Sequence, residues 1–269
     1  GALARAGLDD DALAAVNPGL VVLSMSAAGQ HGPGAAMRAY APVMSSFVGL
    51  EGLIGYAGEA PLGGLNFGLG DPNAALHGMV ALLSALRRRD RDGRGVRIDL
   101  SQVECLLSIL AAPLIDASLG APQPAPIGAG HPDLAPHGVY PAAGEDRWLV
   151  LSVSDDAGWR ALLDCIGGAA GDWRARFATA DARRAGAAEI DRGLAAWTAV
   201  HDRDALCARL RAAGVAASPV LSIEEVRGDA GFLWRGTLRE VAHPVSGPES
   251  LMVAPWRADT FEASIERSS

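Results

Sequence analysis

Short runs of β-forming apolar residues alternate along this chain with longer segments of helical periodicity. Residues 20–25 (LVVLSM) and residues 96–100 (VRIDL) are compact runs that predict strands. Between them, apolar residues recur at helical spacing from residue 75 to residue 86. Because alternating strands and helices are typical of one architecture, the sequence predicts an α/β fold.

The helix of this first alternation has the clearest predicted boundaries. Asp71 precedes Pro72, which favours a helix start with Asp71 as the N-cap that accepts a backbone N–H two or three residues further on. The arginines at 87–89 suit its C-terminal end, where positive charge is favourable. Ser101 is then predicted to cap a further helix from residue 102 to about residue 110. The expected buried face of the first helix consists of Ala75, Met79, Leu82, Leu83 and Leu86.

The composition changes between residues 121 and 136, where five prolines alternate with glycines and exclude both a helix and a central strand. Such a segment indicates a crossing between domains. Beyond it the sequence predicts strands at 148–153 and 216–220, helices at 157–166 and 202–213, and a helix capped by Ser222 and Glu225. The predicted domains are a large domain over residues 1–130, a small α/β domain over 131–222, and a tail, 223–269, that returns to the large domain.

Composition and charge narrow the class of protein. The chain has 269 residues, of which 49% are hydrophobic and 20% charged, which favours a globular protein over a disordered one. A net charge of −8 without a basic stripe argues against nucleic acid as the main partner. The three cysteines, Cys105, Cys165 and Cys207, stand far apart and cannot all pair, which indicates a reducing compartment. No apolar run reaches the length of about 18 residues needed for a membrane span, and the N-terminus does not resemble a signal peptide. We therefore expect a cytoplasmic protein without a membrane partner.

The search for generic catalytic motifs leaves one candidate residue. The chain contains no GxxxxGK[ST], HExxH, CxxC or GxSxG pattern, and its six histidines are scattered singly. A carboxylate at a helix N-terminus, by contrast, is held in direction and kept anionic by the helix dipole. Asp71 can therefore serve as a helix cap, as a nucleophile, or as both.

Four blocks of the sequence resemble, in the same order, the class III CoA-transferases, the family of formyl-CoA transferase and its acyl-CoA relatives. The first block runs from NPGLV (17–21) through GQHGP (29–33) to RAY (38–40). The others are GD (70–71) with ALLSALRRR (81–89) and GRGVRIDLS (93–101), then GHP to APHGVY (130–140), and AGVAASPV (213–220). Because the resemblance covers nearly all of the chain, the chain is identified as a member of this family, whose fold combines a Rossmann-like large domain with a small α/β domain.

The resemblance implies a function for particular residues. The aspartate of the family's Gly-Asp motif is the nucleophile, so the resemblance assigns this role to Asp71 and a substrate-binding role to Gly70 before it. It implies transfer of coenzyme A from an acyl-CoA thioester to a carboxylic acid through aspartyl anhydride and aspartyl thioester intermediates. The substrates would be coenzyme A thioesters and carboxylic acids, with no permanently bound cofactor and no metal. The usual assembly is an interlocked homodimer.

Four further positions match the family's binding residues. Arg38 and Tyr40 correspond to a basic residue and a tyrosine near the CoA chain. Gly128 and Gly130 lie where the family carries a glycine loop that covers the site, although the loop here contains fewer glycines. The position after the tyrosine, often acidic in the family, is Ala41.

Two other functions remain open at this point. Acyl-CoA racemases share the fold but use a histidine and an aspartate as a pair of bases, and the histidine position is Tyr40 here, whose phenol is a poor base at neutral pH. Family members also begin with a Rossmann-like region, whereas the sequence from Gly1 onward matches only the part of the family that follows it. The chain could thus be a fragment, a complementary subunit of a heteromeric enzyme, or a non-catalytic module.

Overall fold

The computed structural model describes residues 2–62 and 68–260. The chain forms two compact units, Gly1–Ala129 and Gly130–Ser269, which we describe separately. The predicted glycine-rich stretch at 63–70 lies largely outside the described residues. The return of residues 223–269 to the first unit stays a prediction.

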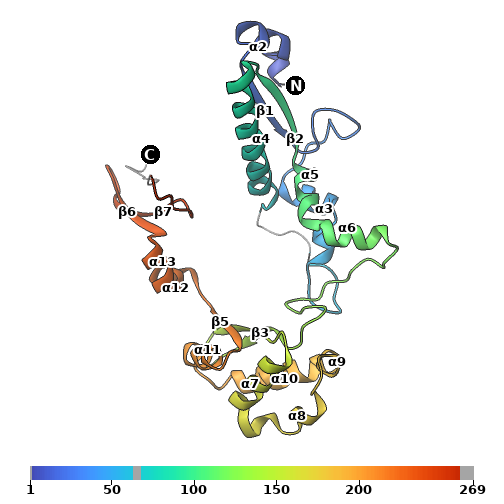
Figure 1. The fold of residues 1–269 in the computed structure, drawn as a ribbon, viewed down its shortest axis with the longest axis vertical. Coiled ribbons are helices and arrows are strands. Elements are labelled where there is room, and N and C mark those ends of the chain that lie inside the picture. The colour runs from blue at the N-terminus through green and yellow to red at the C-terminus, as the bar shows by residue number, and fades with distance from the viewer. Residues whose placement is uncertain (1, 63–67, 261–269) are drawn as a thin grey trace. The chain divides into compact units, whose positions relative to one another are not determined.

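The first unit is built on a parallel β-α-β arrangement. Its elements are α1 (Ala2–Arg5), α2 (Asp10–Val16), β1 (Val21–Ser26), α3 (Ala41–Phe47), η1 (Leu50–Leu53), α4 (Gly70–Asp92), β2 (Val96–Ser101), α5 (Gln102–Leu107), η2 (Ser108–Leu110) and α6 (Ala111–Ser118). Strands β1 and β2 pair in parallel from Val21↔Val96 to Ser26↔Ser101. Helix α4 runs beside both strands as part of the crossover between them (Figure 1). Because a crossover helix runs antiparallel to its strands, the N-terminal end of α4 lies at their carboxyl ends.

Helix α4 packs through small residues. Its buried positions are Gly70, Ala74, Gly78 and Ala85. A Cβ at Gly78 would lie 3.2 Å from Cδ2 of Leu23 and 3.3 Å from Sδ of Met25, so the helix backbone approaches β1 closely. The predicted apolar face was wrong: Ala75, Met79 and Leu83 are exposed, the last two by 54% and 57%, and Leu82 and Leu86 are half-buried. The close approach leaves no room for bulky side chains at the contact, so small residues occupy it.

The start of α4 also differs from the prediction. The helix begins at Gly70 with Leu69 as N-cap, and no side chain caps it. Leu69 already has helical dihedral angles, φ −57° and ψ −27°, and its carbonyl accepts the N–H of Asn73 at 3.2 Å. Asp71 therefore lies in the first turn and is not the N-cap. The predicted cap at Ser101 is confirmed, since its Oγ accepts the N–H of Glu104 at 3.3 Å.

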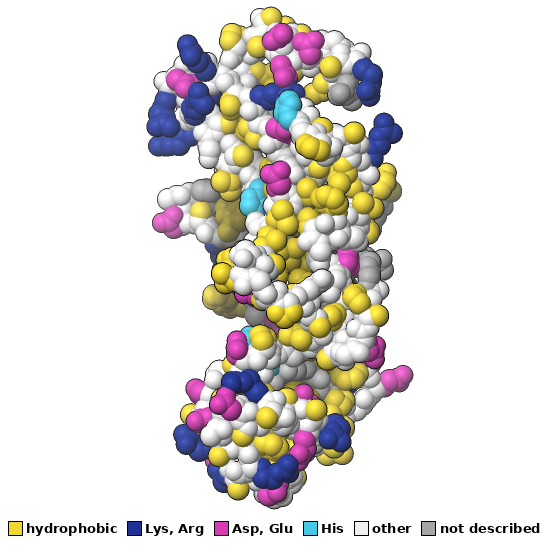
Figure 2. All heavy atoms as spheres, turned by 90° about the vertical axis from the view of Figure 1, so that its right-hand side faces the viewer, with side chains coloured by type: hydrophobic (Ala, Val, Ile, Leu, Met, Phe, Trp, Pro, Cys, Tyr) yellow, Lys and Arg dark blue, Asp and Glu magenta, His cyan; other side chains and the backbone are white. Residues whose placement is uncertain are grey.

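One face of the first unit carries many exposed apolar side chains. Figure 2 shows hydrophobic side chains gathered at the level of α3, α5 and α6. Exposed large residues of these elements and of η2 are Val43, Phe47, Ile109, Leu114 and Ile115.

The second unit is built on an antiparallel sheet in the order β3-β4-β5. Its elements are β3 (His137–Pro141), β4 (Trp148–Ser152), α7 (Asp156–Ile166), η3 (Gly167–Ala170), α8 (Trp173–Arg176), α9 (Ala180–Ala185), α10 (Ala187–Thr198), α11 (Arg203–Ala212), β5 (Ala216–Val220), α12 (Ile223–Gly228), α13 (Ala230–Arg235), β6 (Leu238–His243) and β7 (Gly247–Met252). Leu149 and Leu151 of β4 face the helices, where they join a large apolar cluster with Trp159, Leu162 and Leu194. The predicted strands at 148–153 and 216–220 and helices at 157–166 and 202–213 are confirmed to within one residue at each end.

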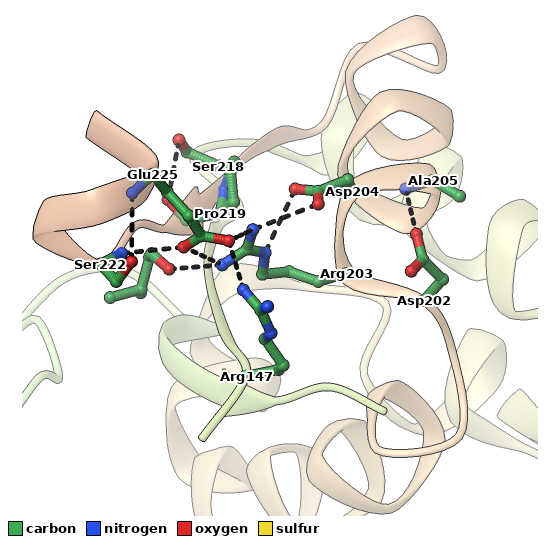
Figure 3. Close-up of polar contacts among 10 residues, drawn as sticks. Arg147, Asp202, Arg203, Asp204, Ala205, Ser218, Pro219, Ser222 and Glu225 are labelled. Carbon is green, nitrogen blue, oxygen red and sulfur yellow. Dashed lines mark hydrogen bonds and ion pairs between the residues drawn. The ribbon is translucent and has the colours of Figure 1, made fainter. Parts of the chain in front are cut away.

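A network of ion pairs and hydrogen bonds connects α11, β5 and α12 (Figure 3). The side chain of Arg203 is 5% exposed and donates to both carboxylate oxygens of Glu225, at 2.7 and 3.1 Å, and to the carbonyl of Val220 at 2.8 Å. Arg147 forms a second ion pair with Glu225. Glu225 also accepts the N–H of Ser222, whose Oγ accepts the N–H of Glu225, so the predicted capping box is confirmed.

Candidate active site

Asp71 lies exposed in the first turn of α4, at the carboxyl ends of β1 and β2. It forms no hydrogen bond and no ion pair with any residue in the described ranges 2–62 and 68–260. Its neighbour Gly70 is buried, and a Cβ there would lie 3.5 Å from both Leu106 and Met44. The backbone of Asp71 is therefore anchored while its carboxylate is left unengaged, which suits a nucleophile.

A second candidate segment follows β1 at the same end of the sheet. Residues 27–40 contain no helix or strand but are held by two consecutive turns, from Gly32 to Ala35 and from Gly34 to Met37. At its end lie Arg38 and Tyr40, both exposed, with Tyr40 exposed by 88%. The large exposed fraction excludes a packing role for the Tyr40 ring within the described structure.

One apolar cluster brings these two segments together. Its buried members are Met44, Val103 and Leu106, and we call it the α3–α5 cluster. Met37 and Ala39, on either side of Arg38, pack against it, as does Leu69, two residues before Asp71. A Cβ at Gly68 would lie 3.3 Å from Cβ of Ala41, which follows Tyr40. The structure therefore places Arg38, Tyr40 and Asp71 around the same small core.

Gly128 of the predicted glycine loop contacts residues 55–57, which follow η1. Gly128 has a φ of +62° and donates its N–H to the carbonyl of Gly55 at 3.0 Å, and its nearest neighbours are Tyr56 and Ala57. Gly130 belongs to the second unit. A covering role of Gly128 and Gly130 over the site stays a prediction.

A polar network that joins the second segment to β2 was missed by the sequence analysis. Both carboxylate oxygens of Asp99 accept the N–H of Gln30, at 3.0 and 2.9 Å. The side chain of Arg97 donates to Oε1 of Gln30 at 3.2 Å and forms an ion pair with Asp10. Gln30 and Arg97 line a cavity of about 430 Å³. The sequence contains a signal for this network. Charged residues at 97 and 99 alternate with apolar residues at 96, 98 and 100, and the structure shows the apolar positions to be more buried.

A buried carboxylate next to α3 was also missed. Glu51 is 7% exposed, and its Oε1 lies 2.5 Å from the Oγ of Ser45. The hydroxyl of Ser45 lies within hydrogen-bonding distance of the carbonyls of Ala41 and Pro42 in the first turn of α3. The pair links η1 to the helix that follows Tyr40, and nothing in the local sequence pattern distinguishes Glu51 from a surface acid.

Other kinds of site find little support in the described residues. No group of three histidine, cysteine, aspartate or glutamate side chains in residues 2–62 and 68–260 is arranged to hold a metal ion. In the same residues, no helix is long and apolar enough to span a bilayer. Cys105, Cys165 and Cys207 are all free thiols. Burial raises the pKa of Cys105 and of Cys207, which lowers their reactivity as nucleophiles.

Comparison with known proteins identifies the family. The model of CoA-transferase family III matches residues 1–269. A probable CoA-transferase of Mycobacterium tuberculosis is 30% identical over 270 residues, which cover 98% of this chain and 33% of that protein. The succinyl-CoA–D-citramalate CoA-transferase of Chloroflexus aurantiacus is 28% identical over 247 residues, which cover 92% of this chain and 61% of that protein.

Solved structures agree with this result. The crystal structure of a CAIB/BAIF family protein from Brucella suis has a TM-score of 0.88 and 27% sequence identity, covering 100% of this chain and 69% of that one. A third relative found by sequence, a formyl-CoA:oxalate CoA-transferase of Streptomyces avermitilis, is 25% identical over 264 residues, covering 92% of this chain and 63% of that protein. This chain spans between a third and two thirds of the length of these curated relatives. It belongs to CoA-transferase family III and has the α/β fold of that family.

Proposed function

We propose that this chain carries the nucleophile of an enzyme that moves coenzyme A from an acyl-CoA thioester to a carboxylic acid. The observation that supports this proposal most directly is the placement of Asp71: an exposed carboxylate without a partner in the described residues, in the first turn of α4, at the carboxyl ends of two parallel strands. Ligands of open α/β sheets bind at this edge.

In the proposed reaction Asp71 passes through three covalent intermediates. Its carboxylate attacks the thioester carbonyl, which releases CoA thiolate and leaves a mixed anhydride. The thiolate attacks the aspartyl carbonyl, which expels the donor acid and leaves an aspartyl-CoA thioester. The acceptor carboxylate then attacks this thioester to form a new anhydride and free thiolate. Attack of the thiolate on the acceptor's acyl carbon gives the product acyl-CoA and restores Asp71. Each intermediate remains activated, so water must be excluded from the site.

Arg38 and Tyr40 would bind the CoA moiety in this scheme. Both side chains are exposed and form no hydrogen bond or ion pair with other described residues, so their polar groups are available to a ligand. An arginine guanidinium suits the phosphates of coenzyme A, because it presents several donors in a fixed geometry. We expect acyl-CoA and a carboxylic acid as substrates, with no permanently bound cofactor.

The Asp71 assignment is tested with Asp71→Asn and Asp71→Ala in the full-length protein. We expect transfer activity to fall by several orders of magnitude in both, because the anionic nucleophile is lost. Since Asp71 does not cap α4, each variant should lose only about 0.3–1 kcal/mol of unfolding free energy, from the lost charge–dipole interaction. Mass spectrometry after incubation with acyl-CoA should detect an adduct at Asp71 in the parent protein, and borohydride should remove it by reducing the aspartyl thioester to an alcohol. Asp116→Asn, an exposed change in α6, is the matched control. A folded Asp71→Asn variant with near-parental activity, and no adduct in the parent, would overturn the assignment.

The racemase alternative is separated by isotope exchange. A transferase leaves the α-hydrogen of a chiral 2-methylacyl-CoA untouched, so no deuterium should enter from deuterated solvent. A racemase removes that proton and would wash deuterium in. Rapid exchange, detected by mass spectrometry of the recovered thioester, would favour the racemase.

The assembly and location of the protein are further parts of this proposal. The resemblance implies an interlocked homodimer, and a complementary subunit is the other assembly we consider. One relative, 29% identical, is named as the alpha subunit of a succinyl-CoA–L-malate CoA-transferase of Chloroflexus aurantiacus. We expect a cytoplasmic protein, and its three free thiols fit a reducing compartment.

A further inference from the structure

Asp99 occupies the strand next to β1 and reaches across to the loop that follows β1. It pairs in register with Ser24. In β2, Val96, Ile98 and Leu100 are more buried than the two residues between them, so Asp99 and Arg97 lie on the more exposed face of the strand pair. The carboxylate of Asp99 accepts the N–H of Gln30, in the loop that follows β1, with both oxygens.

The loop conformation is suited to this contact. Gly29 has a φ of +80°, which favours glycine, and a Cβ there would lie 3.6 Å from Oδ2 of Asp99. The turn at Gly29 directs the next N–H, that of Gln30, at the carboxylate. Arg97 holds the Gln30 side chain at 3.2 Å, so the backbone and the side chain of Gln30 are both attached to β2.

Two internal turns and two packed side chains lie between this anchor and the proposed CoA-binding residues. The carbonyl of Gly32 accepts the N–H of Ala35 at 3.2 Å, and that of Gly34 accepts the N–H of Met37 at 2.9 Å. Met37 and Ala39 then pack on the α3–α5 cluster. Tyr40 follows as the N-cap of α3, and its carbonyl accepts the N–H of Met44 at 3.2 Å. Between Gln30 and Tyr40 the loop is therefore held by two internal turns and by the packing of Met37 and Ala39.

We propose that Asp99 is a positioning residue for coenzyme A binding: it fixes the loop at Gln30 so that Arg38 and Tyr40 are held in their binding positions before the ligand arrives. This inference rests on the proposed function. A loop without regular secondary structure must otherwise be ordered when the ligand binds, which reduces affinity. Asp99 itself does not touch the substrate in this scheme, so its effect passes through the loop.

The test measures CoA binding by isothermal titration calorimetry and steady-state kinetics in the full-length protein. The variants are Asp99→Ala, Asp99→Asn and Arg38→Ala, with Asp116→Asn as a control for loss of an exposed carboxylate. We expect Asp99→Ala to weaken CoA binding about tenfold and to raise KM for acyl-CoA with a much smaller change in kcat, because preorganisation is lost while the nucleophile stays. Asp99→Asn keeps one acceptor oxygen and should lie between the parent and Asp99→Ala.

A double-mutant cycle separates positioning from a general effect on folding. If Asp99 acts through the loop that carries Arg38, Asp99→Ala should weaken binding much less in the Arg38→Ala background than in the parent. Amide hydrogen exchange in residues 27–39 should rise in Asp99→Ala and stay unchanged in Asp116→Asn. Parental CoA affinity in Asp99→Ala, or full additivity with Arg38→Ala, would overturn the inference while Asp71-dependent transfer stands. Failure of the parent protein itself to bind CoA would overturn the proposed function and this inference together.

Discussion

At the scale of single residues, a buried phenol joins the sheet of the second unit to α10. Tyr140 of β3 is 3% exposed, and its hydroxyl donates to Oδ1 of Asp191 at 2.6 Å. Burial raises the pKa of Tyr140 well above its ordinary value, and the hydrogen bond to Asp191 raises this pKa further. Both causes disfavour the phenolate, because a buried anion beside a carboxylate is neither solvated nor paired.

This shift predicts a loss of stability at alkaline pH. Since the folded pKa lies above the unfolded value of about 10, the stabilising contribution is complete below pH 10 and declines as the pH rises above it, by at most about 1.4 kcal/mol per pH unit. Tyr140→Phe should cost about 1 kcal/mol at neutral pH through the lost hydrogen bond, and should remove this alkaline decline. Urea denaturation at pH 8, 9.5 and 11 measures both effects. Tyr56→Phe, at an exposed tyrosine, is the control, and an equal alkaline decline in parent and Tyr140→Phe would contradict the prediction.

At the scale of elements, the packing of α4 decides which substitutions the first unit tolerates. Ala74 is fully buried against Leu100 and Cys105, whereas its neighbour Ala75 is exposed. We expect Ala74→Leu to lower the unfolding free energy by about 1–3 kcal/mol, because the added volume forces the helix away from β2. Ala75→Leu should change it by less than about 0.5 kcal/mol. Thermal unfolding followed by circular dichroism compares the two. The reverse ranking would show that α4 presents its other face to the sheet.

The charge network of the second unit is a second element-scale prediction. Removing Arg203 takes away the nearly buried partner of Glu225 and the donor to Val220, so Arg203→Ala should cost about 2 kcal/mol. Arg160→Ala, at an exposed arginine of α7, should be close to neutral.

The hydrogen bond from Arg203, then that from the Ser222 N–H and the contact with Arg147, hold the pKa of Glu225 well below its ordinary value. Its contribution is therefore complete above the unfolded pKa of about 4.3 and is lost as the pH falls below that value. Urea denaturation at pH 7 and pH 3.5 measures the loss of unfolding free energy between the two pH values. An equal loss in the parent and in Arg203→Ala would contradict this account.

At the scale of the whole molecule, the two units differ in how they bury apolar surface. The described part of the second unit has one large core in which Leu149, Trp159 and Leu194 are buried among helices and sheet. The described part of the first unit has two small clusters, around Met44 and around Ala74, and leaves apolar residues such as Leu76 and Val80 of α4 exposed by 70% and 68%. A small core supplies less stabilisation per ordered residue, so we expect the first unit to be the less stable of the two.

The sequence by itself determined the local features of this protein. The caps at Ser101 and Ser222, the strands at β2 and β4, and the existence of α4 all follow from contacts within a few residues, which a sequence pattern records directly. Family membership was also readable, because the motif order extends along nearly the whole chain.

Tertiary structure alone decided the remaining features. Helical periodicity shows that α4 forms, but the choice between Ala74 and Ala75 as its inward residue depends on how closely β1 and β2 approach it. The contact between Asp99 and Gln30 spans 69 residues and exists only because β1 and β2 pair in their particular register. The segments that carry Asp71 and Arg38 likewise come together only because Leu69, Met37 and Ala39 pack on the α3–α5 cluster. Contacts between distant residues depend on the packing of whole elements, and a local sequence pattern contains no record of that packing.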